Sequence, residues 1–180
     1  PLSSFCWKAL VALYEGDVPF EPVMVNLGDP DDRAMLGAIW PFTRFPVLSE
    51  GEGGPHWPEA SILIERLAQT FPAARGLVPA DADAALKVRL LDRTFDLYVH
   101  EQMERVVADR LRPDDGKDPL GVAQVRGVLA TAYDHLERIL PDAGWACGEA
   151  FTLADCAAAP ALFYGNEVQP FADSHPQLAA

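Results

Sequence analysis

The sequence has few basic residues and no long apolar run, and each shortage excludes a class of protein. Its 14 Lys and Arg stand against 27 Asp and Glu, which gives a formal net charge of −13. No basic cluster is present that could release counterions from a nucleic-acid backbone. No apolar run approaches the ~20 residues that a membrane-spanning helix needs, and no signal-peptide pattern opens the chain. We therefore expect neither a nucleic-acid partner nor a membrane partner.

Cysteine is also scarce, with three residues at irregular spacing: Cys6, Cys147 and Cys156. An odd number without a framework pattern favours a reducing cytoplasm over a disulfide-stabilised secreted fold. The chain has 180 residues, enough for one large or two small domains with a real core. It opens on Pro1 without an initiator Met, so we expect it to be part of a longer protein.

The first 75 residues mix helical and extended patterns. Pro46 cannot donate to a sheet ladder, so it marks the first residue of a strand or an edge. The expected elements are a helix over 5–14 with Ser3 or Ser4 as N-cap and Gly16 as its end, a strand over 20–27, a polar connection over 29–39 with one or two helical turns, a strand over 45–49, a turn over 51–54, a return strand at 56–57 and a helix over 61–71. This order predicts an α/β unit.

The second half shows only helical periodicity after a linker over 72–79. Apolar residues recur at helical spacing over 84–111, 122–139 and 153–164, and no strand pattern follows Trp57. Thr152 and Asp155 have the spacing of a capping box, with Phe151 and Cys156 at the positions of a hydrophobic staple. We interpret this motif as a folding device. The predicted domains are residues 1–74, α/β, and residues 80–180, all-helical.

A strand edge at Pro46 and a helix start at Glu59 should lie close together. Free backbone groups at the edge and free N–H groups at the helix N-terminus suit a small peptide-like ligand with a carboxylate. This pair of features predicts a binding site before any family is considered.

Five motifs, in this order, resemble the glutathione transferase family over essentially the whole chain. They are Ser3-Ser4-Phe5-Cys6-Trp7-Lys8, Val18-Pro19-Phe20-Glu21, Trp40 to Leu48, Glu59-Ala60-Ser61-Ile62 and Thr152-Leu153-Ala154-Asp155. The resemblance implies a thioredoxin-like domain followed by an all-helical domain, with the first strand and the C-terminal end missing here. It also implies glutathione as co-substrate, no metal, a homodimer and a cytoplasmic detoxification enzyme.

The resemblance assigns a glutathione-binding set: Arg44, Phe45, Pro46, Val47, Glu59, Ala60 and Ser61. Pro46 matches the family's cis-proline, and the backbone of Val47 would pair with the cysteinyl part of glutathione. Glu59 would meet the γ-glutamyl ammonium, and the N–H at Ala60 its carboxylate. Ala60 stands where the family commonly has Ser, so Ser61 is the alternative source of a hydroxyl. The structural alternative for Glu59, Ala60 and Ser61 is a plain helix cap. Arg44 matches a cation for the glycyl carboxylate or, alternatively, is a solvated loop residue.

The thiol activator has three candidates: Ser3, Ser4 and Cys6. The thiolate is the nucleophile, and a hydroxyl at a helix N-terminus can stabilise it. By resemblance Ser3 matches the catalytic serine of the serine-type classes; each serine is otherwise a plain N-cap. By resemblance to the cysteine-type members of the family, Cys6 would form a mixed disulfide with glutathione. The alternative is that Cys6 is a half-buried packing residue.

The function implied is conjugation of glutathione thiolate to an apolar electrophile. The electrophile pocket would lie between the domains; its candidate residues are Tyr98, Met103, Arg105, Phe163 and Tyr164. Three alternatives remain open: a non-catalytic glutathione-binding or interaction module on the same fold, a zeta-type glutathione-dependent isomerase or lyase, and a thiol transferase that uses Cys6.

Overall fold

The computed structural model describes residues 3–179, and the chain divides into two compact units between Leu77 and Val78. We call them the N-terminal unit and the helical unit, and describe each by itself. No helix formed by residues 3–179 is long and apolar enough to cross a membrane.

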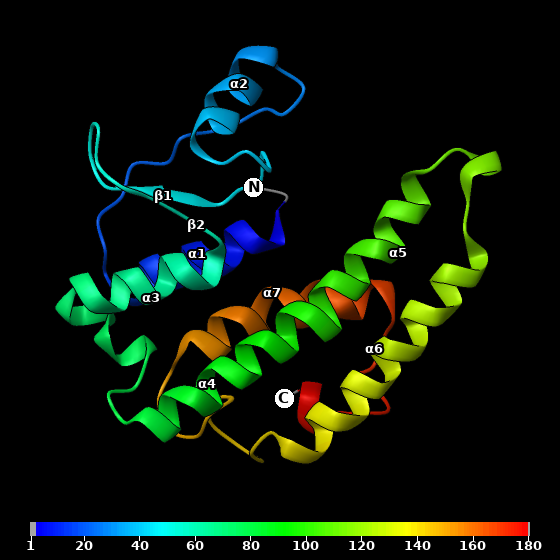
Figure 1. The fold of residues 1–180 in the computed structure, drawn as a ribbon. Helices are drawn as coiled ribbons and strands as arrows, with labels where there is room; N and C mark the ends of the chain where they lie inside the picture. The colour runs from blue at the N-terminus through cyan, green and yellow to red at the C-terminus, as the bar shows by residue number, and fades with distance from the viewer. Residues whose placement is uncertain (1–2, 180) are drawn as a thin grey trace. The chain divides into compact units, whose positions relative to one another are not determined.

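Over residues 3–77 the N-terminal unit forms three α-helices and a short hairpin, and its third helix contacts both the first helix and the hairpin (Figure 1). Its elements are α1 (Ser4–Glu15), α2 (Pro30–Ile39), β1 (Val47–Ser49), β2 (His56–Pro58), α3 (Ala60–Thr70) and a 3₁₀ turn, η1 (Pro72–Leu77). The strands β1 and β2 pair antiparallel, with Val47 opposite Pro58. The predicted helices at 5–14 and 61–71 and the predicted hairpin are confirmed.

The helix α1 begins and ends where its capping residues predict. The Ser3 side chain accepts a hydrogen bond from the Cys6 N–H, and Gly16 is the C-cap. Ser4, Lys8 and Ala12, one turn apart, are buried on one face, and α1 packs against α3. This packing fixes the N-terminus of α1 relative to the N-terminus of α3.

Two predictions for residues 20–39 need correction. The predicted strand over 20–27 is wrong. Within residues 3–179 this segment pairs with no other strand, and Val23 is 75% exposed. Pro19 and Pro22 lack the N–H that a ladder needs at two nearby positions. The polar connection over 29–39 is instead a full helix, α2, because Asp29 caps it and Pro30 occupies its first turn.

The hairpin is held to α3 by Glu50, Trp57 and Arg66. The guanidinium of Arg66 donates to both carboxylate oxygens of Glu50 and lies 5.2 Å from the centre of the Trp57 ring. The Trp57 indole N–H donates to the same carboxylate at 3.0 Å. The hydrogen bond from Arg66 lowers the pKa of Glu50, so this contact is ionic at neutral pH.

Over residues 78–179 the helical unit forms no strand, and its elements are helices joined by turns and loops, with one isolated bridge between Trp145 and Gly148. In the order of the chain the elements are α4 (Ala82–Thr94), a π-helical segment η2 (Phe95–His100), α5 (Glu101–Leu111), a 3₁₀ turn η3 (Asp114–Gly116), α6 (Pro119–Ile139), α7 (Leu153–Val168) and α8 (Pro176–Ala179). Figure 1 shows α4, η2 and α5 as one continuous rod. The predicted all-helical second half is confirmed.

The π-helical segment shifts the buried face along the α4–α5 rod. Phe95 and Val99 are fully buried, whereas Tyr98 is 53% exposed. The Gln102 amide donates to the Leu97 carbonyl at 2.7 Å and so satisfies an acceptor within the segment. A π-helical turn contains about one residue more than an α-helical turn. A prediction that assumes 3.6 residues per turn therefore assigns the wrong residues to the buried face after this segment.

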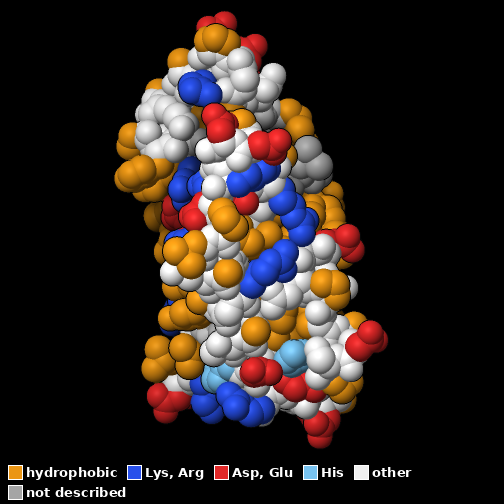
Figure 2. Space-filling view, turned by 90° about the vertical axis from the view of Figure 1, so that its right-hand side faces the viewer, with side chains coloured by type: hydrophobic (Ala, Val, Ile, Leu, Met, Phe, Trp, Pro, Cys, Tyr) orange, Lys and Arg blue, Asp and Glu red, His pale blue; other side chains and the backbone are white. Residues whose placement is uncertain are grey.

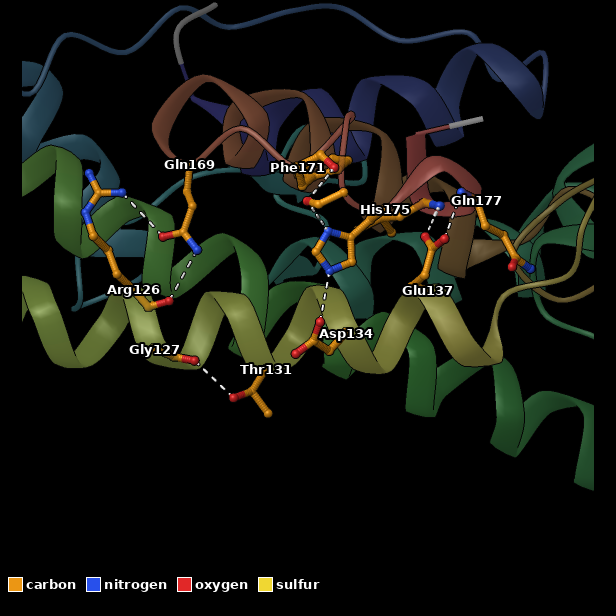
Figure 3. A network of polar contacts seen from close by, with 11 residues as sticks. Arg126, Gly127, Thr131, Asp134, Glu137, Gln169, Phe171, His175 and Gln177 are labelled. Carbon is orange, nitrogen blue, oxygen red and sulfur yellow. Dashed lines mark hydrogen bonds and ion pairs between the residues drawn. The ribbon is translucent and has the colours of Figure 1, made fainter.

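Polar contacts join α6 to the chain that follows α7 (Figure 3). The Arg126 guanidinium donates to the side-chain oxygen of Gln169, and the Gln169 amide donates to the backbone carbonyl of Arg126. The Glu137 carboxylate accepts from two backbone N–H groups at the start of α8, and Asp134 contacts the His175 ring at 3.1 Å. These contacts stabilise the C-terminal turn against α6.

Tyr133 lies in the hydrophobic core of the helical unit, and its buried hydroxyl has no hydrogen-bond partner among residues 3–179. Burial raises the pKa of Tyr133 to about 12. A Cβ on Gly165 would lie 2.8 Å from this hydroxyl and 3.3 Å from a Val99 methyl. The position of Gly165 therefore requires the absence of a side chain.

We expect Tyr133→Phe to leave the free energy of unfolding unchanged or to raise it by ~1 kcal/mol, because it removes a desolvated hydroxyl. Gly165→Ala should destabilise the protein, and less so when Tyr133 is already Phe. Urea unfolding of the two single variants and the double variant measures this coupling. Tyr164→Phe, at a half-buried tyrosine, is the control. A loss above ~1 kcal/mol in Tyr133→Phe would indicate that a buried water pairs the hydroxyl.

Candidate functional site

The Ser3 hydroxyl lies at the N-terminus of α1. Its Oγ accepts the Cys6 N–H at 3.4 Å, and the Ser3 carbonyl accepts the Trp7 N–H at 3.2 Å. A serine hydroxyl carries one donor and two acceptor positions, so the capping bond uses only an acceptor position. The Ser3 hydroxyl can therefore donate a hydrogen bond to a negatively charged atom placed at the positive end of α1.

Ser4 and Cys6 are less suited to that role than Ser3. Ser4 is only 5% exposed and shares the inward face of α1 with Lys8. Burial raises the pKa of the Cys6 thiol, and the hydrogen bond with Ser3 offsets this only in part. A raised pKa leaves less thiolate at neutral pH, which disfavours Cys6 as a nucleophile.

The Phe45–Pro46 peptide bond is cis, immediately before β1. Phe45, Pro46 and Val47 are half-buried, and the Glu50 contacts described above hold the far end of β1 to α3. Arg44 is exposed on the loop before them. The backbone at Val47 is thus presented by an anchored hairpin, while Arg44 lies on the solvent side.

The residue before α3 has a strained backbone. Glu59 has φ +70° and ψ 121°, a conformation that is uncommon for any residue with a side chain and costs about 1–3 kcal/mol. Its exposed carboxylate makes no capping bond to α3. The structural alternative for Glu59, a plain helix cap, therefore loses its support. Strain retained at a helix start is typical of a preorganised site.

The first turn of α3 presents backbone donors. The Leu63 N–H makes the first helical bond, to the Glu59 carbonyl at 2.9 Å, so the N–H groups of Ala60, Ser61 and Ile62 have no acceptor within the helix. The Ala60 methyl is buried, with the residue 6% exposed. The Ser61 hydroxyl accepts from the Lys8 ammonium at 2.8 Å.

The sequence did not single out Lys8, which the structure places beside the start of α3. One signal of its unusual position was nevertheless available. Lys8 is the single charged residue in an apolar stretch over 5–14, and an amphipathic helix places such a charge on its solvent face. In the structure Lys8 is instead fully buried, on the side of α1 that faces α3.

The candidate pocket residues of the helical unit differ in exposure. Tyr98 and Phe163 are each 53% exposed and available to a ligand, whereas Met103 is 4% exposed and belongs to the core. Arg105 lines a cavity of about 450 Å³ between α5 and α6. Its other charged lining residues are Asp109, Arg112 and Asp118. Met103 therefore drops out as a pocket residue.

The face of the protein in Figure 2 carries charges of both signs. Figure 2 shows acidic and basic side chains interspersed on the face it presents, without a large patch of one sign. Within residues 3–179, no three His, Cys, Asp or Glu side chains gather closely enough to hold a metal ion. The N-terminal unit presents, at the starts of α1 and α3, backbone N–H groups of the kind that bind organic anions.

Comparisons with known proteins match both parts of the chain to one family. Residues 1–75 match the model of the glutathione S-transferase N-terminal domain, and residues 101–180 match that of the C-terminal domain. A maleylpyruvate isomerase from Ralstonia sp is 27% identical over 176 residues, which cover 94% of this chain and 82% of that protein.

Solved structures share the fold. A glutathione S-transferase from Methylobacillus flagellatus with glutathione bound has a TM-score of 0.88 at 24% identity, covering 98% of this chain and 87% of that one. One from Methylobacterium radiotolerans, in complex with glutathione sulfonate, has a TM-score of 0.81 at 26% identity, covering 98% and 82%. The predicted fold class, a thioredoxin-like domain followed by an all-helical domain, is confirmed. The chain belongs to the glutathione S-transferase family.

Proposed function

We propose that this protein conjugates glutathione to an apolar electrophile, with Ser3 as the group that activates the thiol. One observation carries the proposal: the Ser3 hydroxyl lies at the N-terminus of α1 with its acceptor side used by the Cys6 N–H. Such a hydroxyl donates to sulfur, and the helix dipole adds to the stabilisation of a thiolate.

In the proposed reaction the glutathione thiol loses its proton to solvent as it binds. Ser3 donates a hydrogen bond to the thiolate, which lowers the thiol pKa and raises the fraction of nucleophile at neutral pH. The sulfur lone pair forms a bond to the electrophilic carbon. In a substitution the leaving group departs with the electron pair of the bond that breaks. In an addition the π-electron pair of the attacked double bond moves to the neighbouring atom, which then takes a proton from water.

We propose that the first turn of α3 and the hairpin bind the rest of the tripeptide. The N–H groups at Ala60 and Ser61 would bind the γ-glutamyl carboxylate, and the exposed Glu59 carboxylate its ammonium. The backbone of Val47, next to the cis-proline Pro46 and Phe45, would pair with the cysteinyl part. Arg44 would contact the glycyl carboxylate from the solvent side.

A zeta-type isomerase or lyase is the second candidate. It is favoured by the 27% identity to a protein named maleylpyruvate isomerase. In that reaction glutathione would add to the substrate and leave again, so it would not be consumed. An assay that follows both the thiol and the substrate separates the two: conjugation consumes thiol in proportion to product, and isomerisation does not.

We further propose that the protein acts as a cytoplasmic homodimer in detoxification. Leu86 and Leu90 are 65% exposed and Leu97 is 41% exposed, at spacings that place them on one side of the α4–η2 rod. An exposed apolar row of this kind favours association with a second copy. The mass of the protein in dilute solution, by light scattering, tests the dimer.

Binding is the first measurement, and we expect glutathione to raise the melting temperature of the protein. At 100 times its dissociation constant a ligand adds about 2.7 kcal/mol to stability, which is a rise of roughly 5 to 10 °C for a chain of this length. Glycine and cysteine at the same concentration are the controls. No shift at millimolar glutathione would contradict the proposal, including its form as a non-catalytic glutathione-binding module.

A further inference from the structure

Lys8 is a fully buried lysine between two helices of the N-terminal unit. Its exposed fraction is 0%, although lysine is almost never fully buried unless its ammonium is paired. The Nζ atom donates to Ser61 Oγ at 2.8 Å, from α1 to α3 across 53 residues of sequence. Burying an ammonium is costly, so its position in the fold calls for a physical reason.

The position is the N-terminus of α3. Ser61 is the second residue of this helix, after Ala60 and the N-cap Glu59. Because an ammonium only donates, the Ser61 hydroxyl accepts in this bond, which restricts the rotation of the hydroxyl. The positive charge of Lys8 is therefore held one side chain away from the N–H groups of the first turn, where the helix is itself positive. Two positive features at one place favour an anion there.

We infer that Lys8 is a positioning residue for the γ-glutamyl carboxylate of glutathione, an inference that rests on the proposed function. Its ammonium orients the Ser61 hydroxyl and adds a charge beneath the anion-binding turn of α3. The same bond ties α3 to α1, which carries Ser3. Lys8 therefore acts on the binding of the tripeptide through Ser61 and the helix, and it does not touch the sulfur.

The test compares two ligands on the same variants by calorimetry. One ligand is glutathione, and the other is 4-aminobutyryl-cysteinylglycine, which is glutathione without the γ-glutamyl α-carboxylate. We expect Lys8→Met to raise the dissociation constant for glutathione about tenfold, as for the loss of a charge-assisted contact. The same variant should bind the analogue as the unchanged protein does. Lys8→Arg keeps the charge and should recover most of the affinity.

Each outcome decides the matter. Equal losses for both ligands, or no loss for glutathione, would overturn the role of Lys8 and leave the proposed function standing. Failure of the unchanged protein to bind glutathione would instead overturn the proposed function, and this inference with it. If Lys8→Met does not fold, as its thermal transition would reveal, Ser61→Ala replaces it. That variant should weaken glutathione several-fold and spare the analogue.

Discussion

Replacing Ser3 with glycine should lower kcat/KM for glutathione conjugation about a hundredfold, the usual cost of removing one donor to a charge that the reaction requires. Glycine is the informative replacement because it loses the hydroxyl but costs a helix cap only a few tenths of a kcal/mol. The dissociation constant for glutathione should change little, since the tripeptide is bound by other groups. Steady-state rates and calorimetry on the same preparation measure both quantities.

The pH profile makes the test specific to the thiolate. Without the Ser3 donor the thiolate of bound glutathione is less stable, so its pKa rises and the rate profile moves to higher pH. Ser3→Thr keeps a hydroxyl at the cap and should retain much of the activity. Ser4→Ala, at the buried neighbour, is the matched control. Full activity in Ser3→Gly, or its complete loss in Cys6→Ser, would contradict the assignment of Ser3.

Local signals explain what could be predicted of the fold. The helix over 5–14, the hairpin and the cap at Thr152 each depend on residues within a few positions of one another. The strand predicted over 20–27 is absent because a strand needs a partner strand to pair with. The alternation of apolar residues within the segment does not show whether such a partner exists. The π-helical segment at Phe95–His100 was missed because one extra residue per turn leaves no compositional mark.

The candidate site was predictable to the same extent. The starts of α1 and α3 carry local signatures of helix termini, so their positions were predictable, whereas the roles of Ser3 and Glu59 were assigned by resemblance and stay predictions. The burial of Lys8 was not predictable, because it depends on the packing of α1 on α3, which brings Lys8 to Ser61. The strain at Glu59 is likewise a property of the folded chain that composition does not encode.

Asp155 accounts for the second large effect that we expect, on stability. Its carboxylate accepts the Thr152 N–H at 2.8 Å, which is one half of the predicted capping box, and also accepts the Thr152 hydroxyl at 2.9 Å. It also accepts the Ala146 N–H at 2.7 Å, a bond that the sequence did not suggest. One carboxylate, 6% exposed, therefore starts α7 and anchors the loop before it.

Asp155→Ala should lower the free energy of unfolding by roughly 3 to 5 kcal/mol, more than the ~1 kcal/mol of an ordinary cap. The larger loss follows because the change removes the acceptor of two backbone N–H groups, at the buried Thr152 and the half-buried Ala146, together with that of the Thr152 hydroxyl. Urea unfolding monitored by circular dichroism measures it, with the exposed Asp142→Ala as the control. Thr152→Val removes the hydroxyl alone and should cost less than half as much. A loss below 1 kcal/mol in Asp155→Ala would mean that the loop reaches water and re-pairs its N–H groups, and α7 would then be stabilised by its buried apolar face.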